Sequence, residues 1–142
     1  MFLGTFHHTL DDKGRLAIPA RFRAELLSGL VVTRGTDRCL TVYPLAAWEV
    51  LARKLDALPI GDSHARDYRR VQFGGAEQTE LDKQGRIVLS ERLRNYAGLT
   101  ADVAVVGVSS FIELWDQATW EALETRVETQ SDELAAHLAE HL

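Results

Sequence analysis

The chain contains two copies of one segment, and this internal repeat limits its possible folds more than any other feature. The stretch LDDKGRLAIPARFR, which starts at Leu10, returns as LDKQGRIVLSERLR from Leu81. The copies lie 71 positions apart, half of the 142-residue length. After a one-residue insertion the offset becomes 72, and Trp48 then matches Trp120, each followed by a glutamate. Self-similarity at a fixed offset indicates a duplicated structural unit.

Each copy is too small to build a stable core alone. A unit of roughly 50 residues is near the size at which a single core becomes marginal without disulfides, metal or association. Cys39 is the only cysteine, so no disulfide can form within the chain. We therefore expect the two copies to pack on each other.

The composition is that of an ordinary globular protein, with 46% hydrophobic and 26% charged residues. The sequence has no run of about 18 apolar residues that could span a membrane. Its start, MFLGTFHHTLDDKGR, lacks the charged head and apolar stretch of a signal peptide. A lone cysteine also fits a reducing compartment. These features predict a cytoplasmic protein without a membrane partner.

The net charge of −5 hides an uneven distribution along the chain. From Asp116 onward, seven acidic residues face one arginine, Arg126, whereas residues 1–75 carry eleven basic and eight acidic residues. The negative net charge therefore comes from an acidic C-terminal segment, whereas the first half of the chain is mildly basic. This profile permits binding to phosphates without requiring it.

Each copy begins with a predicted β-hairpin, and the two loops have the same chemistry. Apolar or alternating runs at 5–10 and 15–18 flank the first loop, Asp-Asp-Lys-Gly, and the second copy repeats this pattern around 82–85. The first aspartate can accept hydrogen bonds from loop N–H groups, and glycine can adopt the left-handed conformation that closes the loop. We expect four residues to shape the loops: Asp11, Gly14, Asp82 and Gly85.

The remainder of each copy predicts a short helical turn, two strands and a helix. Pro19 and Ser90 stand where the short turn would begin. The expected strands cover 30–34 and 39–43, then 103–108 and 111–115. Apolar residues at helical spacing indicate a helix with one core-facing stripe in each copy: Trp48, Leu51 and Leu55, then Trp120, Leu123 and Val127.

A connecting helix is expected between the copies, because Pro59 and Gly61 end one helix and Gly74 ends the next. Three arginines on this helix form either a solvated face or a contact with phosphate or a neighbouring subunit: Arg66, Arg69 and Arg70. The stretch from Gln117 predicts another helix, and a partner subunit is one candidate to cover its apolar side.

These features resemble the MraZ family of bacterial transcriptional regulators. The resemblance covers nearly the whole chain and rests on two D-x-x-G-R hairpins, each followed by an apolar strand and a short basic helical turn, behind an MFLG start. It implies an α+β fold in which two internal repeats form a tandem swapped-hairpin β-barrel, as in AbrB and MazE proteins, with flanking helices. The expected domains are repeat 1 at 5–49, a helical connector at 50–75, repeat 2 at 76–121 and an acidic tail at 122–142.

The resemblance also implies a function. The expected protein is a sequence-specific regulator that binds short repeats of double-stranded DNA in the promoter of the division and cell-wall gene cluster containing its own gene. A ring-shaped homo-oligomer associated with the nucleoid is expected, without cofactor or small-molecule substrate.

Basic residues in and near the predicted hairpins are the candidate DNA contacts. A twisted two-stranded hairpin fits a major groove, where an arginine can donate two hydrogen bonds to guanine or clamp a phosphate. Arg15 and Arg86 are the first candidates. Lys13 can add a phosphate contact, whereas the second copy has Gln84, so we expect the first hairpin to contribute more. Four further arginines are either backbone contacts or structural ion-pair partners: Arg21, Arg23, Arg92 and Arg94.

Other functions have weaker support in the sequence. The Asp and Arg of each repeat could serve only as a structural brace, in an antitoxin-like or scaffold protein that meets its partner through the acidic tail. His7 and His8 are adjacent on a predicted strand and should face opposite sides, and His137 and His141 have no evident third ligand, so no metal site is expected. No nucleophile elbow, phosphate loop or dinucleotide motif is present, so no enzyme activity is expected.

Overall fold

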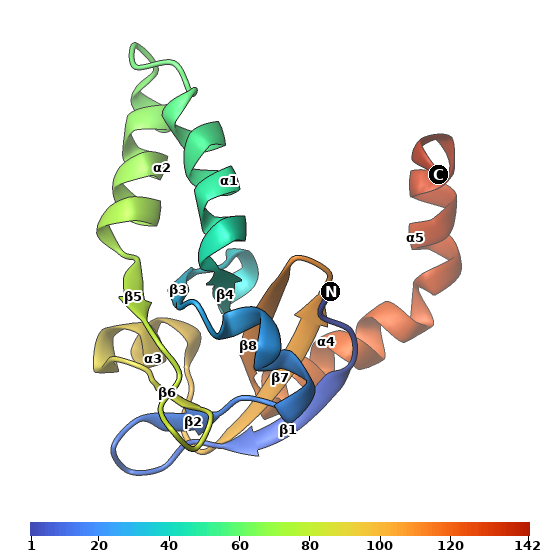
Figure 1. Cartoon of the computed structure of the whole chain (residues 1–142). Coiled ribbons are helices and arrows are strands. Elements are labelled where there is room, and N and C mark those ends of the chain that lie inside the picture. The colour runs from blue at the N-terminus through green and yellow to red at the C-terminus, as the bar shows by residue number, and fades with distance from the viewer.

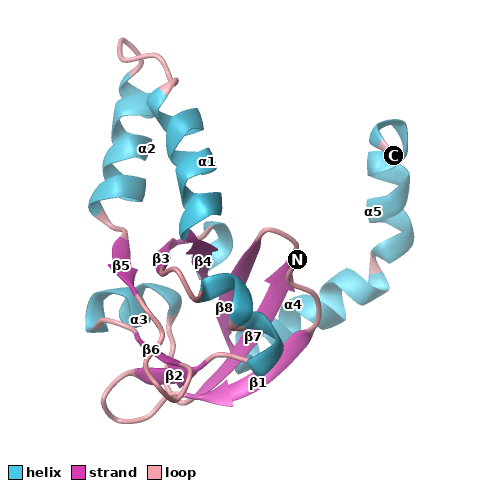
Figure 2. Ribbon diagram, viewed as in Figure 1, coloured by secondary structure: helices cyan, strands magenta, loops and turns pink.

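The computed structural model describes the whole chain, residues 1–142, as an α+β protein (Figures 1 and 2). The strands are β1 (Thr5–Thr9), β2 (Arg15–Ala17), β3 (Leu30–Arg34), β4 (Leu40–Pro44), β5 (Glu77–Thr79), β6 (Arg86–Val88), β7 (Asp102–Val108) and β8 (Phe111–Asp116). The α-helices are α1 (Leu45–Asp56), α2 (Ser63–Gly74), α3 (Glu91–Ala97), α4 (Gln117–Thr129) and α5 (Ser131–Leu138). Short 3₁₀ turns occupy Ala20–Phe22, Ala24–Leu26, Thr36–Arg38 and Ala139–His141.

The two repeats exchange strands with each other. Six strands form an antiparallel sheet in the order β1-β7-β8-β4-β3-β5, and β2 pairs with β6 in a separate ribbon. Only β3–β4 and β7–β8 are pairs within one repeat. The prediction of a β-hairpin at the start of each copy was therefore wrong, because the two strands on either side of each loop pair with strands of the other repeat and not with each other. The pairs β1–β7, β3–β5, β4–β8 and β2–β6 all join one repeat to the other. Each repeat therefore completes the backbone hydrogen bonding of its counterpart.

The expected α+β class is confirmed, and so is the expectation that the copies pack on each other. The hydrogen-bonded strands form an open sheet with β1 and β5 at its edges. A closed swapped-hairpin barrel of the AbrB type remains a prediction.

One hydrophobic core serves both repeats. It contains 19 buried residues, drawn from both halves of the chain. Leu16 on β2 and Ile87 on β6 lie opposite each other, and both side chains point into this core with 0% and 1% exposure. Phe2 is also fully buried, with its ring edge-on to Phe22 at 5.2 Å between centroids. Phe2 therefore belongs to the core, although its neighbours Met1 and Leu3 are exposed.

The short turns after β2 and β6 differ because their first residues differ. Ser90 caps α3 through its hydroxyl, which accepts a hydrogen bond from the backbone N–H of Leu93 at 3.3 Å. Pro19 has no side chain that can accept such a bond, and the equivalent segment forms two 3₁₀ turns in place of an α-helix. The predicted helical turn is present in both copies but is regular in only one.

Helices α1 and α2 form a hairpin that projects from the sheet (Figure 1). The predicted connecting helix is present as α2, whose N-cap Asp62 accepts hydrogen bonds from the N–H groups of His64 and Ala65. Near the sheet, Trp48 of α1 meets Phe73 of α2 edge-on at 5.8 Å. The hairpin is therefore anchored at its base by aromatic packing.

The apolar stripe predicted for the second copy only partly joins the core. Trp120 and Leu123 of α4 pack against a small buried cluster that includes Trp115 and Cys39. Val127 is 38% exposed, because α4 leaves the sheet before its last turn. The expectation that the whole stripe is core was wrong at this position. None of the helices has the length and apolar character needed to cross a membrane.

Because the repeats share one core, a core mutation in either copy should destabilise the same unfolding transition. Leu16→Ala and Ile87→Ala should each lower the free energy of unfolding by about 2–5 kcal/mol. The measurement is chemical denaturation followed by circular dichroism and tryptophan fluorescence. As a control, Val50→Ala on α1, 47% exposed, should change stability by less than about 0.5 kcal/mol. Two separate transitions would contradict the shared core.

Candidate nucleic-acid interface

The two loops with the sequence D-x-x-G-R, residues 11–15 and 82–86, lie close together at one end of the molecule, opposite the tip of the α1–α2 hairpin (Figure 1). They are joined by the β2–β6 ribbon, in which Arg15 pairs with Val88, Leu16 with Ile87, and Ala17 with Arg86. The structure thus brings together two loops that are 71 residues apart in the sequence.

Arg15 and Arg86 share the outer face of this ribbon. Side chains alternate between the faces of a strand, and Leu16 and Ile87 occupy the inner face. Arg15, Arg86 and the 57%-exposed Val88 therefore belong to the outer face. The two arginines are diagonal neighbours across the pair, with Cα atoms roughly 7–8 Å apart by strand geometry.

In the first loop, Asp11 holds both the backbone and the arginine. Its Oδ1 accepts hydrogen bonds from the backbone N–H groups of Lys13 at 2.9 Å and Arg15 at 2.8 Å. Its Oδ2 accepts a hydrogen bond from Nε of Arg15 at 2.5 Å. The Asp11 N–H in turn donates to the carbonyl of Arg15 at 3.0 Å. One carboxylate thus closes the loop and orients the guanidinium.

The second loop repeats this geometry. Oδ1 of Asp82 accepts hydrogen bonds from the backbone N–H groups of Gln84 at 2.8 Å and Arg86 at 2.9 Å. Its Oδ2 accepts a hydrogen bond from Nε of Arg86 at 2.9 Å. The predicted loop-shaping contacts of both aspartates are thus present, as are their pairings with the following arginines.

These hydrogen bonds lower the pKa of both aspartates below its ordinary value. For Asp11 the largest cause is the backbone N–H of Arg15, and the Arg15 side chain and the Lys13 N–H add to it. The pKa of Asp82 is lowered in the same way, first by the backbone N–H of Arg86. Because the folded-state pKa is depressed, the ionised carboxylates stabilise the loops at neutral pH. This contribution is lost as the pH falls through the lowered pKa.

The loop glycines connect the two repeats. Gly14 and Gly85 have φ angles of 76° and 75°, a conformation that L side chains rarely adopt. The carbonyl of Gly14 accepts a hydrogen bond from the N–H of Leu89 at 2.8 Å, and that of Gly85 from the N–H of Ile18 at 2.9 Å. A Cβ on Gly14 would lie 2.7 Å from the carbonyl oxygen of Leu89. Only glycine fits this reciprocal contact.

Arg23 and Arg94 have structural contacts within the fold. Nε of Arg23 donates to the carbonyl of Ile18 at 2.8 Å, and Nε of Arg94 donates to that of Leu89 at 3.0 Å. Each guanidinium also covers the loop glycine of the other repeat, Arg23 over Gly85 and Arg94 over Gly14. Both side chains are half-buried, so they hold the opposite loop in place.

The other residues predicted to contact DNA differ in whether their side chains already have partners within the chain. Arg92 pairs with Glu77 at 2.7 Å and also donates to the carbonyl of Gly75. Arg21 lies over the ring of Phe6, at 5.6 Å from its centroid. Lys13 is exposed at the first loop.

Lys83 is a further basic residue at the loops that the sequence analysis did not identify. The second loop has Lys83 where the first has Asp12, and both side chains are exposed. The first loop therefore combines Asp12 with Lys13, and the second combines Lys83 with Gln84. The second loop carries the more positive charge, so charge does not favour the first hairpin.

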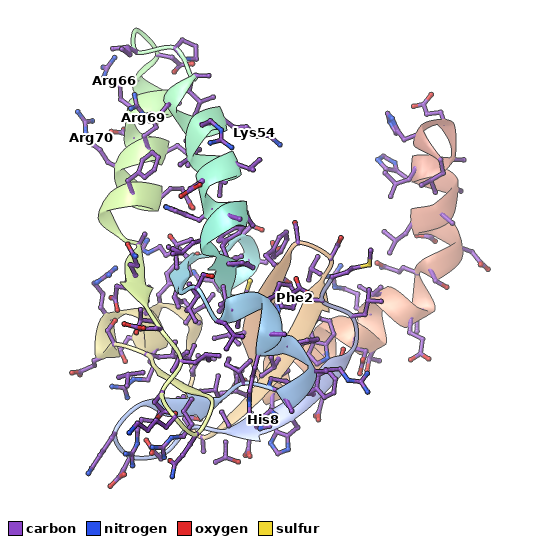
Figure 3. All side chains as sticks on the ribbon, viewed as in Figure 1. Phe2, His8, Lys54, Arg66, Arg69 and Arg70 are labelled. Carbon is purple, nitrogen blue, oxygen red and sulfur yellow. The ribbon has the colours of Figure 1, made fainter.

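The two histidines of β1 face opposite sides, as the alternating exposure of the strand shows. His7 contacts Asp102 through Nε2 at 2.9 Å. His8 lies toward the loop end of the molecule (Figure 3), where burial, followed by the nearby His7 and Arg23, lowers its pKa. His8 is therefore neutral at neutral pH and adds no positive charge to this end.

The comparisons with known proteins agree with the repeat. A family model described as "MraZ protein, putative antitoxin-like" matches twice, over residues 1–71 and 72–141. A protein of Herpetosiphon aurantiacus is 51% identical over 142 residues, covering 100% of this chain and 96% of its own. A Thermomicrobium roseum protein is 49% identical over 139 residues, covering 98% of both chains. A Moorella thermoacetica protein is 47% identical over 140 residues, covering 99% and 98%. All three are named transcriptional regulator MraZ.

Arg15→Ala should raise the pKa of Asp11 only part of the way to its ordinary value, because the backbone N–H groups that lower it most remain in place. The pKa is measured from the side-chain carboxyl ¹³C shift as a function of pH. Asp82 is an internal control and should not change. A complete return of Asp11 to its ordinary pKa would mean that the side chain, and not the loop backbone, dominates.

Proposed function

The chain belongs to the MraZ family, and from this premise we propose that it regulates transcription by binding double-stranded DNA through the outer face of its β2–β6 ribbon. The names of the curated relatives support a role in transcriptional regulation. Arg15 and Arg86 are the residues that make the central contacts with DNA.

The observation that carries this proposal is the way both arginines are held. Within the chain each guanidinium donates to its aspartate through Nε alone. The terminal nitrogens of Arg15 and Arg86 remain open to solvent-side acceptors on a shared face. A guanidinium in this state can donate two parallel hydrogen bonds to O6 and N7 of guanine, or clamp a phosphate.

The ribbon also has a suitable shape. A two-stranded antiparallel ribbon fits into the major groove, which is about 12 Å wide in B-DNA. Because the aspartates fix the arginine side chains before binding, little rotamer entropy is lost when DNA is bound. Lys13 and Lys83 at the loop tips, together with Arg21 and Arg92, supply contacts to phosphates.

The proposal also covers the DNA target, the location and the assembly of the protein. The target is a set of short repeats in the promoter of the division and cell-wall gene cluster that contains this protein's own gene. The protein acts in the cytoplasm at the nucleoid as a ring-shaped homo-oligomer. The strand exchange between the repeats supports a relationship to AbrB-type swapped-hairpin modules, with repeats at 5–49 and 76–121.

The alternative is an antitoxin-like or scaffold protein in which the Asp–Arg pairs are only braces. Asp11 holds its loop closed in the absence of DNA, which is what a structural brace would do. The two functions differ in what the arginine side chain contributes. Its removal leaves the backbone hydrogen bonds of the loop in place, so a brace and a DNA contact can be separated.

Arg15→Ala should weaken DNA binding while leaving the thermal stability almost unchanged. Loss of one bidentate contact is worth about 1–3 kcal/mol, which corresponds to roughly 5–150-fold in affinity. The measurement is fluorescence anisotropy with a duplex from upstream of the gene. Wild-type affinity should also fall steeply as salt increases, because phosphate contacts release counterions.

Arg53→Ala is the matched control, since Arg53 is an exposed arginine on α1 at a distance from the loops. It removes the same charge and should bind DNA nearly as well as the wild type. A folded Arg15→Ala variant that binds normally would favour the brace. Removal of the exposed residues 127–142 should leave contact with a single DNA site intact, whereas a tail-driven scaffold would lose its partner.

Affinity should depend strongly on the number of DNA repeats. One small ribbon covers too little DNA for tight binding, and linked contacts raise the effective concentration. A duplex with three or four repeats at near helical-turn spacing should therefore bind far more tightly than a duplex with one. Equal affinity for both, measured at one salt concentration, would argue against binding through avidity.

A further inference from the structure

The C-terminal arm, defined here as residues 127–142, extends away from the body of the molecule (Figure 1). Every residue of the arm is exposed. Apolar side chains nevertheless recur along it, with Leu134 at 43% exposure and Leu138 one helical turn later at 46%. A short helix that contacts only its own neighbours is marginal in water, so this arm needs another surface to stabilise it.

The arm is also acidic. Between its first residue and Leu142 it has four carboxylate side chains and no lysine or arginine. The carboxylates are Glu128, Asp132, Glu133 and Glu140. A complementary surface would therefore combine apolar groups with positive charge.

One side of the α1–α2 hairpin offers such a surface. A hollow of about 350 Å³ is lined by Ile60, Arg66, Arg69, Arg70 and Phe73. Ile60 is 73% exposed at its rim. Figure 3 shows the three arginines on one side of α2, whereas Lys54 points to the other side of the hairpin.

The arginines of this hollow keep donors free for a partner. Arg66 donates through one Nη to the carbonyl of Ile60, and Arg70 through one Nη to Asp67, which is 73% exposed. Arg69 pairs with Asp56 at 3.3 Å, and its Nε is buried without a partner. The cluster therefore has unused hydrogen-bonding capacity next to exposed apolar carbon.

Neither the DNA face nor the same chain's arm occupies this hollow. The hairpin tip and the β2–β6 loops lie at opposite ends of the molecule (Figure 1), so one duplex on the ribbon does not reach it. The arm of the same chain is fully exposed and leaves the body on another side. The acidic and apolar arm of a second copy of the chain fits the chemistry of this hollow.

We propose that the C-terminal arm of one copy docks into the arginine-lined hollow of the α1–α2 hairpin of a second copy. Leu134 and Leu138 cover Ile60 and Phe73, and the carboxylates of the arm pair with Arg66 and Arg70. Arm and hollow are different surfaces, so the contact is heterologous, and each copy can give one arm and receive another. The proposal concerns the partner in the assembly and does not require that the loops bind DNA.

A charge exchange tests the pairing, with the mass in solution measured by light scattering. Arg66→Glu with Arg70→Glu, and separately Asp132→Arg with Glu133→Arg, should each reduce the mass toward the 15.9 kDa of one chain. The four substitutions combined in one chain restore complementarity and should restore the larger mass. The matched control, Arg53→Glu with Lys54→Glu, reverses two charges on α1 outside the hollow and should leave the assembly intact.

Cysteine cross-linking tests the same contact without charge changes. The native Cys39 is buried, and burial first, with nearby Glu113, raises its pKa to about 12, so it does not interfere. A chain with Ile60→Cys mixed with a differently tagged chain with Leu138→Cys should form a disulfide between the two chains. Ala47→Cys in place of Ile60→Cys, on α1 away from the hollow, should not.

Several results would overturn the proposal: a wild-type protein that is a single chain, reversed variants that keep the full mass, a combined variant that fails to reassemble, or no cross-link from Ile60. The assembly variants should still bind a duplex with one repeat, in a manner that requires Arg15. Loss of that binding in correctly folded variants would count against the proposed DNA face, whereas the mass and the cross-link report on the arm alone.

Discussion

The reciprocal backbone contacts between the two loops determine much of the structure. The carbonyl of Gly14 accepts a hydrogen bond from the second repeat, and the carbonyl of Gly85 accepts one from the first. These contacts set the register in which β2 and β6 pair. The register in turn directs Leu16 and Ile87 inward and both arginines outward, because a shift of one residue would reverse the faces. The core and the candidate DNA face therefore depend on the same few hydrogen bonds.

Covalent fusion of the two units allows the loops to differ while this shared frame is kept. In a symmetric dimer of one unit, every substitution would occur in both loops. Here Asp12 and Lys13 in one loop correspond to Lys83 and Gln84 in the other, and all four side chains are exposed. The divergence lies at the loop tips, whereas the aspartates, glycines and arginines that form the frame are the same in both.

The sequence was sufficient to predict the local features of the fold. The loop turns, the Asp–Arg pairs and the connecting helix α2 all depend on residues close together in the chain, where turn and capping chemistry act directly. Two features depend on distant residues and could not be predicted in this way. The partner of each strand is one of them, and the other is the contact of Arg23 with the loop of the opposite repeat.

A similar limit explains the errors on particular residues. Val127 continues the spacing of the α4 stripe, but spacing does not say where a helix leaves the sheet that covers it. Arg94 and Arg15 have the same charge, yet one packs over a glycine of the other repeat and the other faces outward. Burial of a long cationic side chain depends on the three-dimensional neighbours of its stem, and these are set by the strand exchange.

The Asp–Arg pairs also affect how the protein would select DNA. A guanidinium paired with its own carboxylate carries little net charge, so its attraction to the phosphate backbone at a distance is small. What it retains is a fixed direction for its terminal N–H donors, and direction matters for base edges more than for phosphates. The whole chain has a net charge of −5, which further weakens non-specific attraction to DNA. Under the proposed function, affinity therefore comes from several correctly spaced contacts, and the strand exchange supplies the rigid frame that holds the arginines of each copy in register.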